Sequence, residues 1–119
     1  MEKTITVSGR SVAFKATGAT LRIYRQLFSR DLLVDIQKLE NEAKSGGQLS
    51  ADALEIFENI AYTMAKQANP DIEPTPDEWL DTFDMFSIYE ILPQIIQLWG
   101  INMQSVAESK KKAGKRSAH

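Results

Sequence analysis

The amino-acid sequence predicts a mainly α-helical fold with a small N-terminal β-hairpin, in the α+β class, with about four to five helices packed on the hairpin. Apolar residues alternate with a period of two over about residues 3–16 and recur at helical spacing from residue 21 onward. Capping and helix-breaking residues then divide the helical part. Because 43% of the 119 residues are hydrophobic, the chain can bury one core, and we expect a single domain over residues 1–107.

The hairpin is predicted from two runs of strand-favouring residues, 4–7 and 12–15. They flank Ser8-Gly9-Arg10-Ser11, a Gly-bearing sequence that is typical of a hairpin loop. The apolar residues expected to share one face of the sheet are Ile5, Val7, Val12 and Phe14. Since an isolated hairpin is only marginally stable, we expect it to pack on the helices that follow.

Two apolar stripes at helical spacing follow the hairpin. The first consists of Leu21, Tyr24, Leu27 and Phe28, and the second of Leu32, Ile36, Leu39 and Ala43. Thr20 is the predicted N-cap, and the pair Gly46 and Gly47 can supply a left-handed C-cap. The pattern leaves open whether Ser29 separates two helices or lies inside one.

The clearest predicted helix spans residues 51–69, between a capping Ser50 and a closing Pro70. Its apolar face carries Leu54, Phe57, Ala61, Met64, Ala65 and Ala68. Ile56 and Ile60 broaden that face, so we expect the helix to be buried on more than one side.

Two capping boxes, each a hydroxyl residue followed by a carboxylate at the third position, are predicted in the next part of the chain. Thr75 and Glu78 open a short helix with Pro76 in its first turn. Ser87 and Glu90 open the last helix, whose apolar residues lie nearly all round it. We therefore expect the last helix to be the central one, bent at its internal Pro93.

The sequence contains no catalytic or cofactor-binding pattern. Its only histidine is the terminal His119, and it has no P-loop, GxGxxG or Gly-x-Ser-x-Gly sequence. Six carboxylates lie close together, but two prolines interrupt them and they lack the spacing of a calcium loop: Asp71, Glu73, Asp77, Glu78, Asp81 and Asp84. We expect a non-enzymatic protein without cofactor or metal, in which these residues form either a capped helix start or an acidic surface for a basic partner.

Charge divides the chain into an acidic body and a basic tail. Residues 1–107 contain 9 Lys and Arg against 15 Asp and Glu, a net charge of −6, and residues 108–119 contain 5 against 1, a net charge of +4. We expect the tail to be disordered. It has no aromatic residue for base stacking, so specific nucleic-acid binding is not expected, although an accessory role on nucleic acid through the tail remains a third alternative.

The chain has no Cys, no apolar segment of a secretory signal at its start and no run of about 18 apolar residues. We therefore expect a soluble, cytosolic protein without a membrane partner.

Several segments follow one another in a distinctive order. A hairpin "TITVSGRSVAFKAT" precedes an "RDLL" helix, "LEIFENIAYTMAKQANPD", the acidic "TPDEWLDTF", "IYEILPQIIQLWGINM" and a Lys-rich end. In this order they resemble the tail assembly chaperones of long-tailed bacteriophages and prophages of Gram-positive bacteria, over essentially the whole chain.

The resemblance implies a chaperone that binds the phage tape measure protein in the host cytoplasm, keeps it soluble while the tail tube polymerises around it, and is absent from the mature virion. In many such phages a longer product arises by ribosomal frameshifting, and its extension recruits the tail tube protein. Consecutive lysine codons readily make the slippery run that such frameshifting uses, and the sequence has them at Lys110, Lys111 and Lys112. Repeated copies would coat a long client better than single ones, so a homo-oligomer is also expected.

A chaperone for an apolar helix needs an exposed apolar edge or groove. The residues expected to form it are Trp79, Phe83, Met85, Phe86, Trp99, Ile101 and Met103. Met suits adaptable packing, but the alternative that all seven belong to the core stays open. The second hypothesis for function is a small phage-encoded regulatory adaptor that binds a host protein through the acidic region from Asp71 to Asp84.

Overall fold

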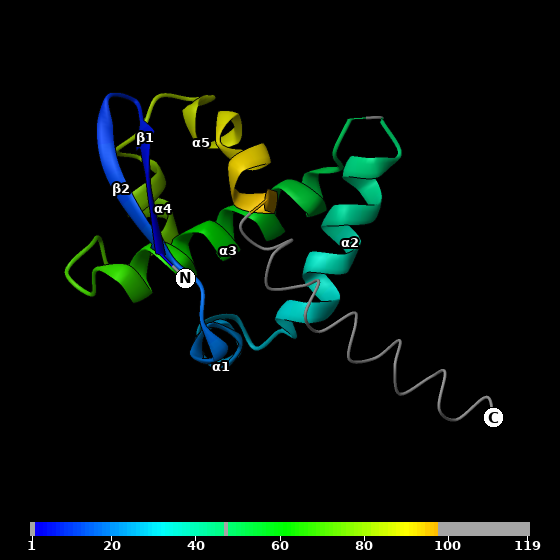
Figure 1. Ribbon diagram of the computed structural model, residues 1–119, viewed down its shortest axis with the longest axis horizontal. Helices are drawn as coiled ribbons and strands as arrows, with labels where there is room; N and C mark the ends of the chain where they lie inside the picture. Colours follow the sequence, from blue (N-terminus) through cyan, green and yellow to red (C-terminus); the bar gives the residue numbers. More distant parts are fainter. Residues whose placement is uncertain (1, 47, 98–119) are drawn as a thin grey trace.

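The computed structural model describes residues 2–46 and 48–97. Its elements are β1 (Glu2–Val7), β2 (Arg10–Lys15), α1 (Gly18–Phe28), α2 (Leu32–Lys44), α3 (Ala51–Ala68), α4 (Pro76–Leu80) and α5 (Ser87–Glu90), and helical backbone resumes over residues 92–97. The predicted mainly α fold with an N-terminal antiparallel hairpin is therefore confirmed (Figure 1). The predicted tail, with Lys110, Lys111 and Lys112, and the predicted domain end at residue 107 lie outside the described residues.

The hairpin turn consists of Ser8 and Gly9 alone, because Val7 and Arg10 already pair. Both turn residues have positive φ, 53° and 75°, as a type I′ turn requires. Arg10 and Ser11, expected in the loop, instead begin β2. The apolar residues predicted to share one face are all buried: Ile5, Val7, Val12 and Phe14.

Ser29 separates two helices, which answers the question that the sequence pattern left open. It adopts φ 57° and ends α1, and Asp31 then caps α2. The N-cap of α1 is Thr17 and not the predicted Thr20, whose hydroxyl accepts a hydrogen bond from the Thr17 N–H at 2.8 Å. After α2, Gly46 has φ 75°, the left-handed conformation expected at a helix end.

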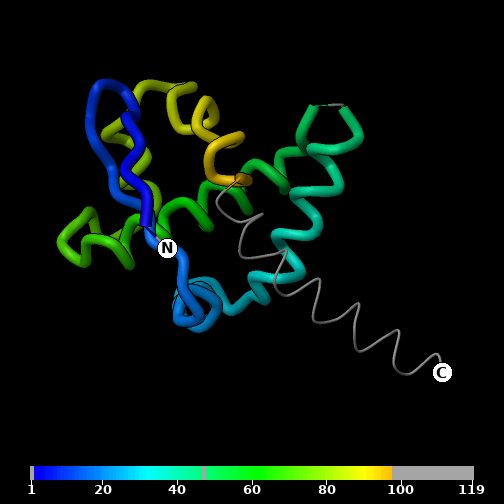
Figure 2. The backbone as a smooth tube through the Cα atoms, in the orientation of Figure 1, coloured from blue at the N-terminus to red at the C-terminus, as the bar shows by residue number. Residues whose placement is uncertain are grey.

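The central element of the described fold is α3, which passes between the hairpin and α2 (Figures 1 and 2). Ser50 caps it as predicted, since its Oγ accepts from the Ala53 N–H at 3.1 Å. All six residues from 60 to 65 are buried, which confirms that the helix is enclosed on more than one side. The expectation that the last helix would be central is wrong for the part of that helix that the structure describes.

The first predicted capping box is confirmed only in part, by the N-cap of α4. Thr75 Oγ1 accepts from the Glu78 N–H at 3.2 Å, and Pro76 occupies the first turn. Because the N–H groups of a first turn have no partner within the helix, proline is tolerated there without loss of a hydrogen bond.

The second predicted capping box is absent. The N-cap of α5 is Phe86, no side chain caps the helix, and Ser87 is its first residue. The helix is interrupted at Ile91, so Pro93 lies in the first turn of the stretch 92–97, where the absence of its N–H is tolerated. The expected bend within one continuous helix is therefore replaced by a break two residues earlier.

The α5 region is joined to α3 by Tyr89. Its hydroxyl donates to the Glu58 carboxylate, and its ring lies 6.4 Å from that of Phe57. The hydrogen bond to Glu58, with burial, raises the pKa of Tyr89 to about 12. Ile88, Ile91 and Ile95 are buried in the same hydrophobic core.

Candidate interaction surface

The structure divides the residues predicted to bind a partner into three groups. Trp79 is buried, Phe83 is half-buried, and Met85 and Phe86 are 79% and 68% exposed. Trp99, Ile101 and Met103 lie outside the described residues. The alternative that all seven are core residues is therefore wrong for Met85 and Phe86.

Trp79 lies in the core, which corrects its expected place on the partner-binding surface. Its ring meets the rings of Phe14, Tyr62 and Phe83 edge-on, with centroids 6.4, 5.7 and 4.9 Å apart. These partners come from β2, from α3 and from the loop after α4. Trp79 thus holds the hairpin, the central helix and the following loop together.

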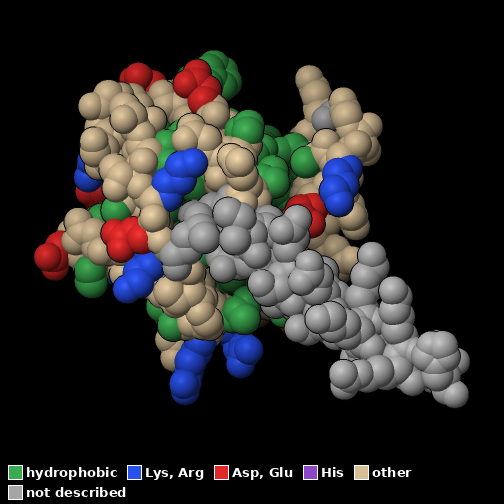
Figure 3. Space-filling model, viewed as in Figure 1, with side chains coloured by type: hydrophobic (Ala, Val, Ile, Leu, Met, Phe, Trp, Pro, Cys, Tyr) green, Lys and Arg blue, Asp and Glu red, His purple; other side chains and the backbone are tan. Residues whose placement is uncertain are grey.

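Met85 and Phe86, the exposed pair, lie in the loop between α4 and α5. Large apolar side chains with this much exposure are uncommon when they adjoin one another, and such patches mark contact surfaces. Phe83, three residues before Phe86, packs on Trp79 and so connects the loop to the core. At this edge of the molecule, acidic and apolar side chains lie next to each other (Figure 3).

The hairpin turn and the first residue of β2 fix the position of this loop. Ser8 Oγ accepts from the Asp84 N–H at 3.0 Å, and Arg10 Nη1 donates to Thr82 Oγ1 at 3.1 Å. The Arg10 guanidinium also lies 5.8 Å from the centroid of the Phe83 ring, within the range of a cation–π interaction. These contacts from Ser8 and Arg10, called the turn contacts below, hold residues 82–84 and so fix the backbone that leads into the exposed pair.

The sequence offered no signal for the turn contacts. Ser8 and Asp84 are 76 residues apart, and Arg10 and Thr82 are 72 apart. No helix or strand period relates residues at such separations, so only the tertiary structure shows that the hairpin turn supports this loop.

Carboxylates surround the exposed pair along the chain. The acidic segment, residues 71–90, holds seven Asp and Glu and no Lys or Arg. Six of the seven are exposed, and Glu73 is half-buried. In the part of the chain that the structure describes, Glu73 alone among them has an ion-pair partner, Arg10, at 3.9 Å. The surface beside the exposed pair therefore carries negative charge that the described residues leave uncompensated.

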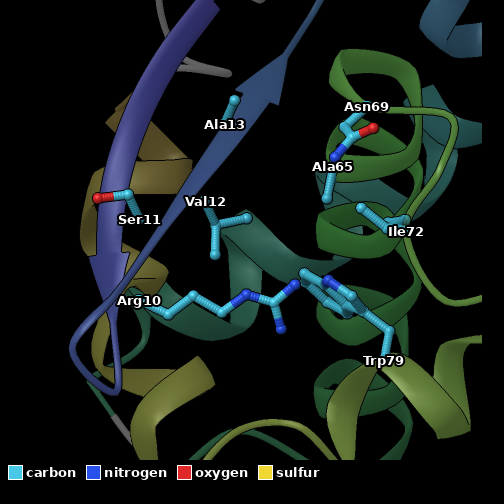
Figure 4. Close-up of a pocket in the computed structure, with 8 residues that line it drawn as sticks. All are labelled: Arg10, Ser11, Val12, Ala13, Ala65, Asn69, Ile72 and Trp79. Carbon is cyan, nitrogen blue, oxygen red and sulfur yellow. The ribbon is translucent and has the colours of Figure 1, made fainter.

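A cavity of about 170 Å³ lies between β2 and the end of α3. Val12, Ala65, Ile72 and Trp79 form apolar walls, and the Arg10 side chain reaches from β2 toward Trp79 (Figure 4). Arg10 is the one charged residue among those that line it, and Thr82 and Glu73 already engage its guanidinium. Among the described residues that line the cavity, Arg10 thus has no carboxylate beside it in the lining.

Within residues 2–46 and 48–97, no group of three or more His, Asp or Glu side chains is placed to hold a metal ion. Over the same residues, the helices are too short or too polar to cross a lipid bilayer. Comparisons of the chain with family models, with curated proteins and with solved structures give no match.

Proposed function

We propose that this protein is a tail assembly chaperone of a long-tailed bacteriophage or prophage, which binds an apolar helical segment of the tape measure protein and keeps it soluble. The observation that carries the proposal is the exposure of Met85 and Phe86 side by side on a loop that the hairpin turn holds in place. The order of segments along the whole chain supports the same function.

The exposed pair suits the capture of a helix. Burial of a large apolar side chain contributes about 1.5–3 kcal/mol, so covering Phe86 stabilises a complex that leaves the core unchanged. Met85 has an unbranched, polarizable side chain that adapts to different partner surfaces. An apolar helix would lie across the exposed pair with its anchors spaced three or four residues apart.

The remaining parts of the proposal concern assembly in the host cytoplasm. Several copies bound along one tape measure protein would cover it more completely than a single copy. A longer frameshifted product, made where Lys110, Lys111 and Lys112 are encoded, would recruit the tail tube protein, and the chaperone would leave before the virion is complete.

Co-expression with the tape measure protein of the same phage tests the proposal. We expect soluble tape measure protein only when this protein is present, and a large loss of soluble protein with the double variant Met85→Ser, Phe86→Ser. Val34→Ser is the matched control, because Val34 is 62% exposed on α2 and lies outside the proposed surface. The proposal is overturned if the tape measure protein is equally soluble with and without this protein.

A second candidate function is a phage-encoded adaptor that binds a basic surface of a host protein. It is favoured by the exposure of five carboxylates between Asp71 and Asp84, namely Asp71, Asp77, Glu78, Asp81 and Asp84. A stoichiometric host protein retained from lysate in the absence of phage proteins, and lost when these carboxylates become amides, would favour the adaptor over the chaperone.

A further inference from the structure

We infer that the exposed pair selects apolar helices flanked by Lys or Arg, so that its partner segment is a positively charged amphipathic helix. This inference rests on the proposed function, because it names the chemistry of the segment that the same surface captures. The apolar pair provides the contact, and the neighbouring carboxylates decide which apolar helices are accepted.

The charges that make this selection lie on both sides of the exposed pair. Asp81 and Asp84 precede it and Glu90 follows it, and all three are exposed. No Lys or Arg occurs between residues 71 and 90. The one cation that pairs with this segment among the described residues, Arg10, lies at Glu73. A helix that covers Phe86 therefore places its flanking side chains among carboxylates with which no described Lys or Arg forms an ion pair.

The loop holds charge and apolar surface in one arrangement. Because the Asp84 N–H bonds to Ser8 Oγ and Thr82 Oγ1 accepts from Arg10, the backbone just before Met85 does not move freely. Fixed charges favour a complementary ligand without reordering, and like charges are rejected. At about 0.1 M salt, such surface charges act over about 10 Å, and more salt screens them further.

Three synthetic peptides, each about 18 residues long, test the inference on the full chain by fluorescence anisotropy. The first is an amphipathic helix of Leu and Lys, the second carries Glu at every Lys position, and the third keeps the Lys residues but has Ser at every Leu position. We expect the Leu/Lys peptide to bind at least about tenfold more tightly than the Leu/Glu peptide at low salt, and the Lys/Ser peptide not to bind. In 0.5 M salt, the affinities for the Leu/Lys and Leu/Glu peptides should differ by no more than about threefold.

Double variants test which residues cause the preference for the Leu/Lys peptide over the Leu/Glu peptide. Asp81→Asn with Asp84→Asn should lower the ratio of the two affinities by about threefold or more. Glu40→Gln with Glu55→Gln removes the same charge from α2 and from the start of α3, and should leave the ratio unchanged. Met85→Ser with Phe86→Ser should weaken binding of the Leu/Lys peptide, because the apolar contact is shared by any accepted helix.

The outcomes separate this inference from the proposed function. Equal affinity for the Leu/Lys and Leu/Glu peptides, with the tape measure protein still kept soluble, overturns the inference and leaves the function. Binding of the Lys/Ser peptide overturns the inference too, since charge alone would then suffice. Self-association that Met85→Ser with Phe86→Ser abolishes would overturn it as well, because a second copy would then cover the pair. Failure to keep the tape measure protein soluble overturns the function itself.

Discussion

The Tyr24 hydroxyl donates a 2.7 Å hydrogen bond to Asp35 Oδ2 and so joins the two helices that Ser29 separates. Arg30 donates to the same carboxylate twice, from Nε at 2.7 Å and from Nη2 at 2.8 Å. Asp35 is only 2% exposed, so three donors satisfy a buried carboxylate. The cluster fixes how α1 and α2 meet before both pack on α3.

Replacement of Asp35 should therefore be costly. We expect Asp35→Asn to lower the free energy of unfolding by about 2–3 kcal/mol, because an amide leaves the Arg30 charge without its partner. Tyr24→Phe should lower it by about 1–2 kcal/mol, since Arg30 still satisfies the carboxylate. Guanidinium unfolding measures both, and the exposed Glu55→Gln should change stability by less than about 0.5 kcal/mol. Equal losses for all three variants would contradict the role of the cluster.

The same carboxylate makes stability depend on acid pH. The hydrogen bonds from Arg30, with that from Tyr24, outweigh burial and hold the pKa of Asp35 below its ordinary value of 3.8. A lowered folded-state pKa contributes stability above the unfolded value and loses it as pH falls through the folded value. Urea midpoints measured from pH 7 to pH 2.5 should therefore decrease once the pH is below about 4. Over the same range, the difference in midpoint between Asp35→Asn and the parent protein should become smaller. A constant difference at every pH would refute this linkage.

Replacement by alanine should change the stability of the protein in opposite directions at two of its glycines. Gly9 has φ 75° in the hairpin turn, so Gly9→Ala should destabilise the protein by about 1 kcal/mol. Gly18, the first residue of α1, has an ordinary φ, and outside its chain neighbours and its own helix backbone no described atom lies within 4 Å of the point that an alanine methyl would occupy there. Gly18→Ala should therefore stabilise the protein by about 0.4–1 kcal/mol. Thermal unfolding of both variants measures the direction of each change in stability. Changes in the same direction for both variants would contradict the argument from backbone conformation.

Alanine substitutions at Trp79 and at Phe86 should affect different properties, stability at Trp79 and partner binding at Phe86. Trp79→Ala removes a fully buried side chain and should lower the free energy of unfolding by about 3–5 kcal/mol. Phe86→Ala should change it by less than about 0.5 kcal/mol while weakening capture of the partner helix. Denaturant unfolding and peptide binding are measured on both proteins. A large loss of stability for Phe86→Ala would assign that residue to the core.

The turn contacts should protect the Asp84 amide from solvent. Ser8→Gly keeps the positive φ but removes the acceptor, and Arg10→Gln removes the cation that holds Thr82. Each should speed hydrogen exchange of the Asp84 amide about fivefold, equal to about 1 kcal/mol of local stability. Arg22→Gln, an exposed change on α1, serves as the control, and NMR reads each amide separately. Unchanged exchange in both variants would show that the loop keeps its position without the turn.

Local signals predicted the caps and turns whose partners lie within a few residues. Ser50 and Thr75 cap helices as expected because each accepts from an N–H three positions ahead. The cap of α1 was misplaced because two threonines compete for that role. Thr17 Oγ1 accepts from the Ala19 N–H at 3.2 Å, and Gln67, far along the chain, bonds to both threonines: its Nε2 donates to Thr17 Oγ1 at 2.7 Å, and Thr20 Oγ1 donates to its Oε1 at 2.5 Å.

The candidate surface was only partly predictable for a related reason. Trp79 and Phe86 are both large aromatic residues near one short helix, and sequence spacing does not rank their burial. Rings from Phe14 and Tyr62 enclose Trp79, and both belong to elements far from it in sequence. Only tertiary contacts therefore separate the core residue from the exposed one.

The distance along the chain between Ser8 and Asp84 also bears on the order of folding during synthesis. The hairpin is translated before residue 84, and the bond from the Asp84 N–H to Ser8 Oγ forms only when that residue has left the ribosome. Phe14 likewise meets Trp79 only after residue 79 has been made, so a shorter nascent chain leaves the Phe14 ring without that edge-on partner. A ribosome that stalls before residue 79 therefore holds a chain whose core is incomplete, and partly folded chains that expose apolar surface are prone to aggregate.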